Sequence, residues 1–217
     1  MTTTGRIQTL RASERPATAW LNGGGVTREV AGFPAGAGLD GFEWRVSLAD
    51  VATAGPFSPF PGIDRVITLV EGPGMVLTVD GAEHRIDTPY RPFAFLGDAT
   101  TDCHLLAGPV VDFNVMTRRG KVTAEVTIVT SAPTSADVPP GGSVLAVCLA
   151  GSATIDVPSD TSGDTSGDTS GDASGDTAGT AAVTNLARYD AALLARPGPF
   201  RLQPDGITAV ITFRPTA

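Results

Sequence analysis

The chain has 217 residues, of which 41% are hydrophobic, and a formal net charge of −8. This apolar content is enough to bury a core and excludes a wholly disordered chain. Five aspartates of one short repeat carry much of the charge, and removing them leaves −8 + 5 = −3. The sequence therefore offers no strong positive charge for phosphates, and we expect no nucleic-acid partner.

The first predicted strand follows a run of three glycines. The segment Trp20–Val30 (WLNGGGVTREV) places them before an alternating, β-branched stretch, which indicates a tight bend that enters a strand. A second strand is predicted over Phe42–Val51 (FEWRVSLADV), where large apolar side chains alternate with mostly polar ones. This alternation predicts one apolar face and one polar face.

Short strands and turns continue along the chain. Arg65–Val70 and Met75–Val79 flank the turn sequence EGPG and predict a hairpin, and the pair Asp80-Gly81 turns the chain again. Further strand-like segments are Phe93–Phe95, Cys103–Leu106 and Val110–Met116. Short strands separated by turn signals are typical of a closed barrel or a sandwich.

The second half of the chain repeats the pattern of the first half. The sequence VITLVEGPGMVLTVDG corresponds to VLAVCLAGSATIDVPS, and a closing apolar strand, FRLQPDGITAVITF, ends the chain. Strand, glycine turn, strand, turn and strand recur in the same order. We therefore predict an all-β fold with two tandem copies of a small barrel, over residues 1–122 and 123–217.

An insert of Asp-Thr-Ser-Gly repeats interrupts the second copy at about residues 159–180. Its period of four fits neither helix nor strand, and it has no large apolar side chain whose burial would offset the entropy of ordering. We expect a disordered loop at a hairpin tip, whose deletion (Ser159 to Gly179) leaves the melting temperature nearly unchanged. Calcium binding is the alternative, although the nine-residue period and apolar anchor of calcium-binding β-rolls are absent.

An ordered series of motifs resembles the HutD/Ves family of the cupin superfamily over nearly the whole chain. The motifs are Trp20-x-Asn22-Gly23-Gly24-Gly25-x-Thr27-x-Glu29, Trp44-Arg45-x-Ser47-x-Ala49, Phe57-x-x-Phe60-Pro61-Gly62-x-Asp64-Arg65, Phe95-x-Gly97-Asp98 and Asp112-x-Asn114-x-Met116-Thr117-Arg118-Arg119-Gly120. The resemblance implies a jelly-roll-like double barrel (a bicupin) and a link to bacterial histidine utilisation. It also implies a regulatory role there, with formylglutamate as ligand. The repeat insert departs from the family pattern but lies away from these motifs.

Metal and nucleophilic catalysis find little support in the sequence. Metal-binding cupins use a His-x-His pair with further ligands, but this chain has only His84 and His104, neither with a second histidine two positions away. Cys103 and His104 are neighbours on a strand and therefore point to opposite faces. Ser47 lies in no Gly-x-Ser-x-Gly elbow. We expect no metal, no cofactor and no catalytic residue.

The candidate binding site combines arginines with amide, hydroxyl and carboxylate groups. If Trp44 packs outward into a second layer, Arg45 points into the barrel and offers a planar fork to a carboxylate; otherwise it lies at the rim, paired with Asp64 or Glu43. The glycine run allows close approach to a ligand or is only a bend, and Glu29 accepts from a ligand or pairs with an arginine. The candidate ligand-binding residues are Trp20, Asn22, Gly23, Thr27, Glu29, Arg45, Ser47, Arg65, Asn114 and Met116.

Together these features predict a metal-free protein that binds a small anionic metabolite in its first barrel, while the second barrel is structural. One alternative is a metal-independent isomerase or hydrolase with Glu29 as base, and another is a regulatory protein-interaction module. The N-terminal residues lack the apolar core of a signal peptide, and no run of about eighteen apolar residues is present. We expect a cytoplasmic monomer or homodimer, with no membrane partner and with reduced Cys103 and Cys148.

Overall fold

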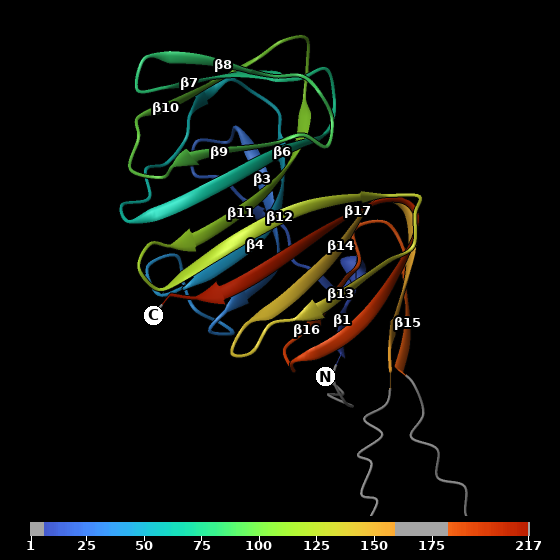
Figure 1. Cartoon of the computed structure of the whole chain (residues 1–217). Helices are drawn as coiled ribbons and strands as arrows, with labels where there is room; N and C mark the ends of the chain where they lie inside the picture. Colours follow the sequence, from blue (N-terminus) through green and yellow to red (C-terminus); the bar gives the residue numbers. More distant parts are fainter. Residues whose placement is uncertain (1–6, 159–181, 217) are drawn as a thin grey trace, which may run out of the picture.

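The computed structural model describes residues 7–158 and 182–216, and strands make up nearly all of their regular structure (Figure 1). The one helical element in these residues is a single 3-10 turn, Ala12–Glu14. The all-β prediction is therefore confirmed. The Asp-Thr-Ser-Gly repeat and the loop predicted for it lie outside the described residues, but the strands on either side pair, with Val157 opposite Ala182.

Two antiparallel sheets face each other in the first half of the chain. The larger follows the order β2 (Thr18–Ala19), β3 (Gly25–Phe33), β4 (Trp44–Val51), β11 (Val110–Arg118), β6 (Ile63–Glu71) and β9 (Pro92–Leu96). The smaller follows β5 (Gly55–Pro56), β10 (Thr101–Leu105), β7 (Met75–Val79) and β8 (Ala82–Ile86). Buried side chains such as Ile67, Leu69, Met75 and Leu77 join the two sheets in one core. The predicted hairpin of Arg65–Val70 with Met75–Val79 is wrong, because β6 and β7 lie in different sheets and do not pair. Gly72 and Gly74, with positive φ angles, instead turn the chain from one sheet to the other. The turn predicted at Asp80-Gly81 is confirmed, because β7 pairs with β8 across it.

A seven-stranded sheet built mainly from the second half curls around its own core. Its order is β1 (Ile7–Leu10), β16 (Ala191–Leu194), β14 (Ser143–Val157), β17 (Gly198–Pro215) and β12 (Val122–Thr130), with β13 (Thr134–Val138) on β17 and β15 (Ala182–Leu186) on β14. Both ends of β14 and of β17 contribute to that core, through Val144 and Ile155 on one strand and Leu202 and Val210 on the other. The two long strands therefore bend around this core and contribute to the packed layers on both of its sides.

The glycine turn expected in the second half is not formed, and that prediction is wrong. Gly151 lies inside β14 and faces Gly206 inside β17. A Cβ atom on Gly151 would lie 2.0 Å from the carbonyl oxygen of Asp205, and one on Gly206 would lie 2.3 Å from that of Ala150. Here glycine permits two paired backbones to approach closely beside a bulge, so the strands bend where the first half makes a turn.

The outer face of the six-stranded sheet packs against the seven-stranded sheet through an apolar layer. Trp44 on β4 stacks on Phe213 of β17, with ring centroids 4.2 Å apart and an interplanar angle of 12°. Val46, Leu48, Phe113 and their neighbours continue this layer. Trp44 therefore faces outward from the first half, and the condition under which Arg45 points inward is met.

The sheets form sandwiches rather than barrels closed by hydrogen bonds, which fits the predicted jelly-roll, cupin-like fold. β1 comes from the first predicted copy but pairs with β16 of the second, Ile7 opposite Leu194. The division near residue 122 stays a prediction. Across residues 7–158 and 182–216 there is no helix with the length and hydrophobicity needed to cross a membrane.

Candidate functional site

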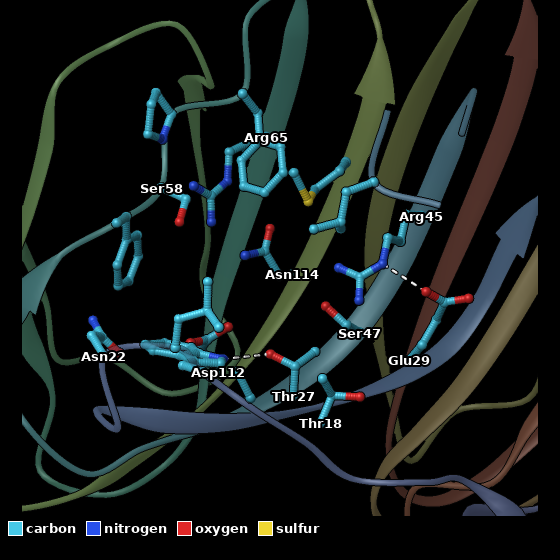
Figure 2. A pocket seen from close by; sticks show the side chains of 18 of the residues that line it. Thr18, Asn22, Thr27, Glu29, Arg45, Ser47, Ser58, Arg65, Asp112 and Asn114 are labelled. Carbon is cyan, nitrogen blue, oxygen red and sulfur yellow. Dashed lines mark hydrogen bonds and ion pairs between the residues drawn. The ribbon is translucent and has the colours of Figure 1, made fainter. Parts of the chain in front are cut away.

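A cavity of about 780 Å³ opens into the first half of the chain (Figure 2). Strands β3, β4, β6 and β11 supply its floor, while β2 and the segments around residues 37–39 and 56–60 supply its walls and mouth. Its lining residues are Thr18, Ala19, Trp20, Leu21, Asn22, Thr27, Glu29, Ala37, Gly38, Leu39, Arg45, Ser47, Ala49, Pro56, Phe57, Ser58, Pro59, Phe60, Arg65, Asp112, Asn114 and Met116.

Strand register arranges the floor of the cavity in three rows. The rows are Thr27–Ala49–Asp112, Glu29–Ser47–Asn114 and Arg45–Met116–Arg65, each made of directly opposed residues on neighbouring strands. Members of successive rows are two residues apart along each strand, so their side chains share one face of the sheet. The bulge in β3 follows Glu29 and lies beyond these rows. Residues far apart in the sequence thus form one surface, which is polar except at Ala49 and Met116.

Arg65 occupies one end of this surface in an aromatic cage. Its side chain is buried, and its guanidinium carbon lies 5.3 Å, 5.6 Å and 4.8 Å from the ring centroids of Phe57, Phe60 and Phe95. Burial lowers the pKa of Arg65 to about 10, against an opposing effect of Asp112, so it remains a cation at neutral pH. The guanidinium makes no ion pair or hydrogen bond to the described residues, and its Nε is buried without an acceptor.

Asp112 and Asn114 follow on β11 with similarly unsatisfied oxygens. Asp112 is 2% exposed and Asn114 is 8% exposed, and the Oδ1 atom of each is buried without a hydrogen-bond donor in the described chain. Burial raises the pKa of Asp112 to about 7, although the nearby Arg65 acts in the opposite direction. Asn114 lies between Arg65 and Asp112 (Figure 2). Three buried side chains of one cavity therefore each have a polar atom without a hydrogen-bond partner among residues 7–158 and 182–216.

Arg45 approaches the cavity from β4 and is held by a carboxylate. Its Nε donates to Oε2 of Glu29 at 2.7 Å, and its side chain is 16% exposed. Gly32 leaves room for this pair, because a Cβ there would lie 3.3 Å from Oε1 of Glu29. The expected rim partners, Asp64 and Glu43, do not pair with Arg45; Asp64 instead binds Arg119.

The entrance is built by Trp20 and the glycine bend behind it. The Trp20 indole donates to Oγ1 of Thr27 at 2.7 Å and meets the Phe57 ring edge-on, with centroids 6.3 Å apart. Asn22 accepts a hydrogen bond from the backbone of Gly24 at 3.0 Å, which stabilises the bend. A Cβ on Gly25 would lie 3.1 Å from the Trp20 ring, so this glycine permits close packing of the chain on the indole.

The structure brings nine of the ten candidate residues around this cavity, namely Trp20, Asn22, Thr27, Glu29, Arg45, Ser47, Arg65, Asn114 and Met116. Gly23 is not among the lining residues; with a φ of 69° it shapes the bend. Asp112 was missed as a candidate, although its spacing from Asn114 and Met116 places it on the same strand face. The walls contributed by Leu21, Leu39 and Phe57 were also missed.

The histidines and cysteines lie apart from this cavity. His84 packs on the ring of Phe93 with centroids 4.7 Å apart, and neither histidine lines the cavity. Cys103 is buried while His104 is exposed, so the pair forms no dyad. Burial raises the pKa of the Cys103 thiol to about 12, which keeps it protonated. No group of three or more potential metal-ligating side chains occurs in the part of the chain that is described.

Comparison with protein families gives a match over most of the sequence. The family model described as HutD matches residues 12–211. An uncharacterized 21.2 kDa protein in the hutC 3′ region of Pseudomonas putida is 46% identical over 111 residues, which cover 51% of this chain and 58% of that protein. Protein Ves of Citrobacter koseri is 41% identical over 115 residues, which cover 52% of this chain and 59% of that protein. Each match thus spans less than two thirds of the relative.

Solved structures show the same architecture over nearly the whole chain. HutD from Pseudomonas fluorescens SBW25, in a formate condition, superposes with a TM-score of 0.76 at 29% identity, covering 97% of this chain and 100% of that one. A conserved protein of unknown function from Pseudomonas aeruginosa PAO1 gives 0.75 at 29% identity, covering 97% and 99%. Lactobacillus farciminis oxalate decarboxylase in complex with formate gives 0.62 at 8% identity, covering 98% and 86%, which shows the fold alone.

Proposed function

The chain belongs to the HutD family, and from that premise we propose that it binds a small carboxylate in the cavity of its first half, with Arg65 as the principal anion-binding residue. The observation that carries this proposal is the state of Arg65. Its guanidinium is buried and charged, yet it has no ion-pair partner among the described residues. A ligand carboxylate would supply that partner.

The energetic argument rests on the cost of an unpaired buried charge. Desolvating a cation is unfavourable unless an anion or several hydrogen-bond acceptors compensate it. Three phenyl rings compensate Arg65 in part through cation–π attraction, but they leave its N–H donors without acceptors. A carboxylate can accept two parallel hydrogen bonds from a guanidinium, so it matches what the site lacks.

Other lining groups set the properties of the ligand. Arg45 lies in the same row as Arg65, on the far side of Met116, and can contact a second anionic group of the ligand. Asn114 and Ser47 lie between the arginines and Asp112 and offer neutral polar contacts. A cavity of about 780 Å³ is large enough for a dicarboxylate with a polar substituent. Formylglutamate has this chemistry, and a regulatory role in histidine utilisation in the cytoplasm would fit the family.

The enzymatic alternative is less well supported. Glu29, which would have to act as base, is already paired with Arg45 and is 44% exposed at its side chain. Its Oε2 already accepts a hydrogen bond from Arg45, so this oxygen holds the arginine rather than facing a proton of the ligand. We therefore propose a binding protein in which Glu29 orients Arg45.

The decisive experiment is a titration of purified protein with formylglutamate, glutamate, urocanate, histidine and divalent metal ions, followed by thermal shift and calorimetry. The Arg65→Met variant keeps an apolar side chain between the three rings and should lose roughly 30-fold or more in affinity for an acid that binds the unmodified chain, about 2 kcal/mol. Arg45→Ala should lose about tenfold, because a partly exposed contact contributes less.

Arg28→Ala is the matched control. Arg28 pairs with Asp50 on the same two strands as the Arg45–Glu29 pair, but neither Arg28 nor Asp50 lines the cavity. The Arg28→Ala variant should bind the acid with the same affinity as the unmodified chain. Unchanged binding by folded Arg65→Met and Arg45→Ala would show that the ligand binds elsewhere. A shift with metals alone would contradict the proposal and make His84 and His104 the next residues to vary.

A further inference from the structure

Asp112 is the one buried carboxylate of the cavity, and the proposed function does not use it. The charged and titratable groups around it come from every neighbouring element: Arg65 on β6, Arg45 and Asp50 on β4, Glu29 on β3 and Cys103 on β10. Arg45 is neutralised by Glu29, Asp50 pairs with Arg28 outside the cavity, and the Cys103 thiol is uncharged. Inside the cavity, Arg65 and Asp112 therefore remain as two opposite charges.

These two charges interact without touching. No ion pair joins them within 4.0 Å, and Oδ1 of Asp112 has no hydrogen-bond donor in the described chain. Asp112 lies two rows from Arg65 along the floor, with Asn114 between them. Asp112 is thus a distant counter-charge to Arg65 rather than its bonded partner.

Binding an anion changes this balance. A carboxylate seated on Arg65 would neutralise the guanidinium, and an ionised Asp112 would then be a second buried negative charge in the same cavity. Like charges at close range in a poorly hydrated site strongly favour protonation of one of them. Protonation of Asp112 costs less free energy than protonation of the ligand carboxylate, because the ion pair with Arg65 stabilises the ionised ligand.

We propose that Asp112 is a specificity-determining residue of the cavity that takes up one proton from solvent when an anion binds at Arg65, so that the ligand meets a neutral carboxyl group able to donate a hydrogen bond. The inference rests on the proposed function, since it requires an anion at Arg65. It adds a selection rule: the ligand has an anionic group at the Arg65 end and a hydrogen-bond acceptor at the Asp112 end. A ligand with a cationic group at that end is disfavoured.

The ordinary protonation equilibrium of Asp112 supports this assignment. Burial by the surrounding protein already raises its pKa to about 7. An anion at Arg65 removes the favourable effect of the guanidinium and raises that pKa further. Affinity is then independent of pH well below 7 and decreases above 7, by up to tenfold per pH unit. The ligand itself does not titrate in this range, because free carboxyl groups have pKa values near 4.

Calorimetric titration of the full chain with formylglutamate, and with formate as a monoanion, tests the proposal between pH 6 and 9. Tris and triethanolamine are suitable buffers, because both are cationic, do not compete for Arg65 and differ in ionisation enthalpy. We expect an uptake approaching one proton per ligand at pH 8 and an affinity that falls above pH 7. Asp112→Asn mimics the neutral carboxyl, so it should bind at least tenfold more tightly than the unmodified chain at pH 8.5, with no uptake.

Asp50→Asn is the matched control, since Asp50 lies outside the cavity and acts on Asp112 only by raising its pKa. This variant should keep the proton uptake, with its midpoint moved slightly to lower pH. If the unmodified chain binds either acid through Arg65 without proton uptake, or if Asp112→Asn keeps the pH dependence, the role of Asp112 is wrong while the proposed function stands. If neither acid binds at any pH, the proposed function fails as well.

Discussion

The two halves of the molecule share an antiparallel jelly-roll architecture but fill their interiors differently. In the first half, the space between the sheets holds a cavity with buried Arg65, Asp112 and Asn114 on its floor. In the second half, apolar side chains such as Ile155, Phe200 and Leu202 fill the interior. The first half thus combines an apolar core with a hollow polar site, whereas the interior of the second half is filled. Unsatisfied buried polar groups reduce stability, and the cavity gathers three of them on one surface, as expected for the ligand proposed above.

Each half also buries an aspartate, and the two aspartates differ in how many hydrogen bonds their carboxylates accept. Asp190 in the second half is 6% exposed, and its carboxylate accepts hydrogen bonds from Arg11 and from the backbones of Ala12 and Ala187. Asp112 has an unsatisfied oxygen instead. Burial acts to raise the pKa of both, but at Asp190 the hydrogen bonds outweigh burial and the pKa is lowered. The carboxylate of Asp190 therefore has its partners within the protein, whereas that of Asp112 can still accept a hydrogen bond.

The largest effect is expected from opening a cavity in the filled half. Leu202 is 1% exposed in the second core, and Leu202→Ala should lower the free energy of unfolding by about 2–5 kcal/mol, since the packed surroundings cannot collapse into the space. Val183→Ala on β15, which pairs with the other side of β14 and where the side chain is 59% exposed, should change it by less than ~0.5 kcal/mol. Urea denaturation measures both. A loss from Leu202→Ala no greater than that from Val183→Ala would show that the second half is not a tightly packed core.

Strand periodicity predicted the floor of the hollow half because it fixes which side chains share a face. Thr27 with Glu29 and Asn114 with Met116 each lie on one face, and Arg45 turns inward because Trp44 stacks on Phe213. The sequence could not predict that stacking, because it brings together strands about 170 residues apart. The sequence left two orientations of Arg45 open, into the cavity or at its rim, and the stacking of Trp44 selects the first.

Asp112 shows the limit of the same reasoning. Its place in the alternation was visible, but a polar residue on a strand is usually solvated, and its burial depends on the covering sheet β5–β10–β7–β8. The cavity mouth was also beyond prediction, because the positions of Leu39 and Phe57 depend on irregular segments whose paths follow no period. Pairing of β1 with β16 joins segments more than 180 residues apart and has no local signal, since Ile7 lies opposite Leu194.

Removing the charge of the satisfied aspartate should destabilise the protein. Asp190→Asn leaves the Arg11 donor and two backbone N–H groups with a weaker acceptor, so we expect a loss of about 2 kcal/mol at pH 7. The lowered pKa of Asp190 means that its contribution is complete above pH 4 and is lost as pH falls below that value. Denaturation at pH 7 and at pH 3 should show a smaller difference at pH 3. An equal loss at both pH values would contradict the role of the charge.

Removing the charge of Asp112, the unsatisfied aspartate, should stabilise the protein instead. The folded-state pKa of about 7 for Asp112 exceeds the value near 4 of an unfolded chain, so the folded state binds more protons between these values. Stability from this group therefore decreases as pH rises from 4 to 7 and is lowest above 7. Asp112→Asn should raise the free energy of unfolding by about 1–2 kcal/mol at pH 8, and the gain should shrink toward pH 5. A loss of stability at pH 8 would mean that the carboxylate has a partner.

The smallest effect is expected where both partners of an ion pair are solvated. Arg214 on β17 and Glu125 on β12 pair at 3.0 Å, with side chains 50% and 64% exposed. A double-mutant cycle to alanine at these positions should give a coupling energy below ~0.5 kcal/mol that falls further in salt, because water screens the charges. The same cycle on Arg45 and Glu29 should give a larger coupling, since Arg45 is only 16% exposed. If the two cycles gave equal couplings, the hollow half would not differ electrostatically from the molecular surface, and the case for a preorganised anion site would weaken.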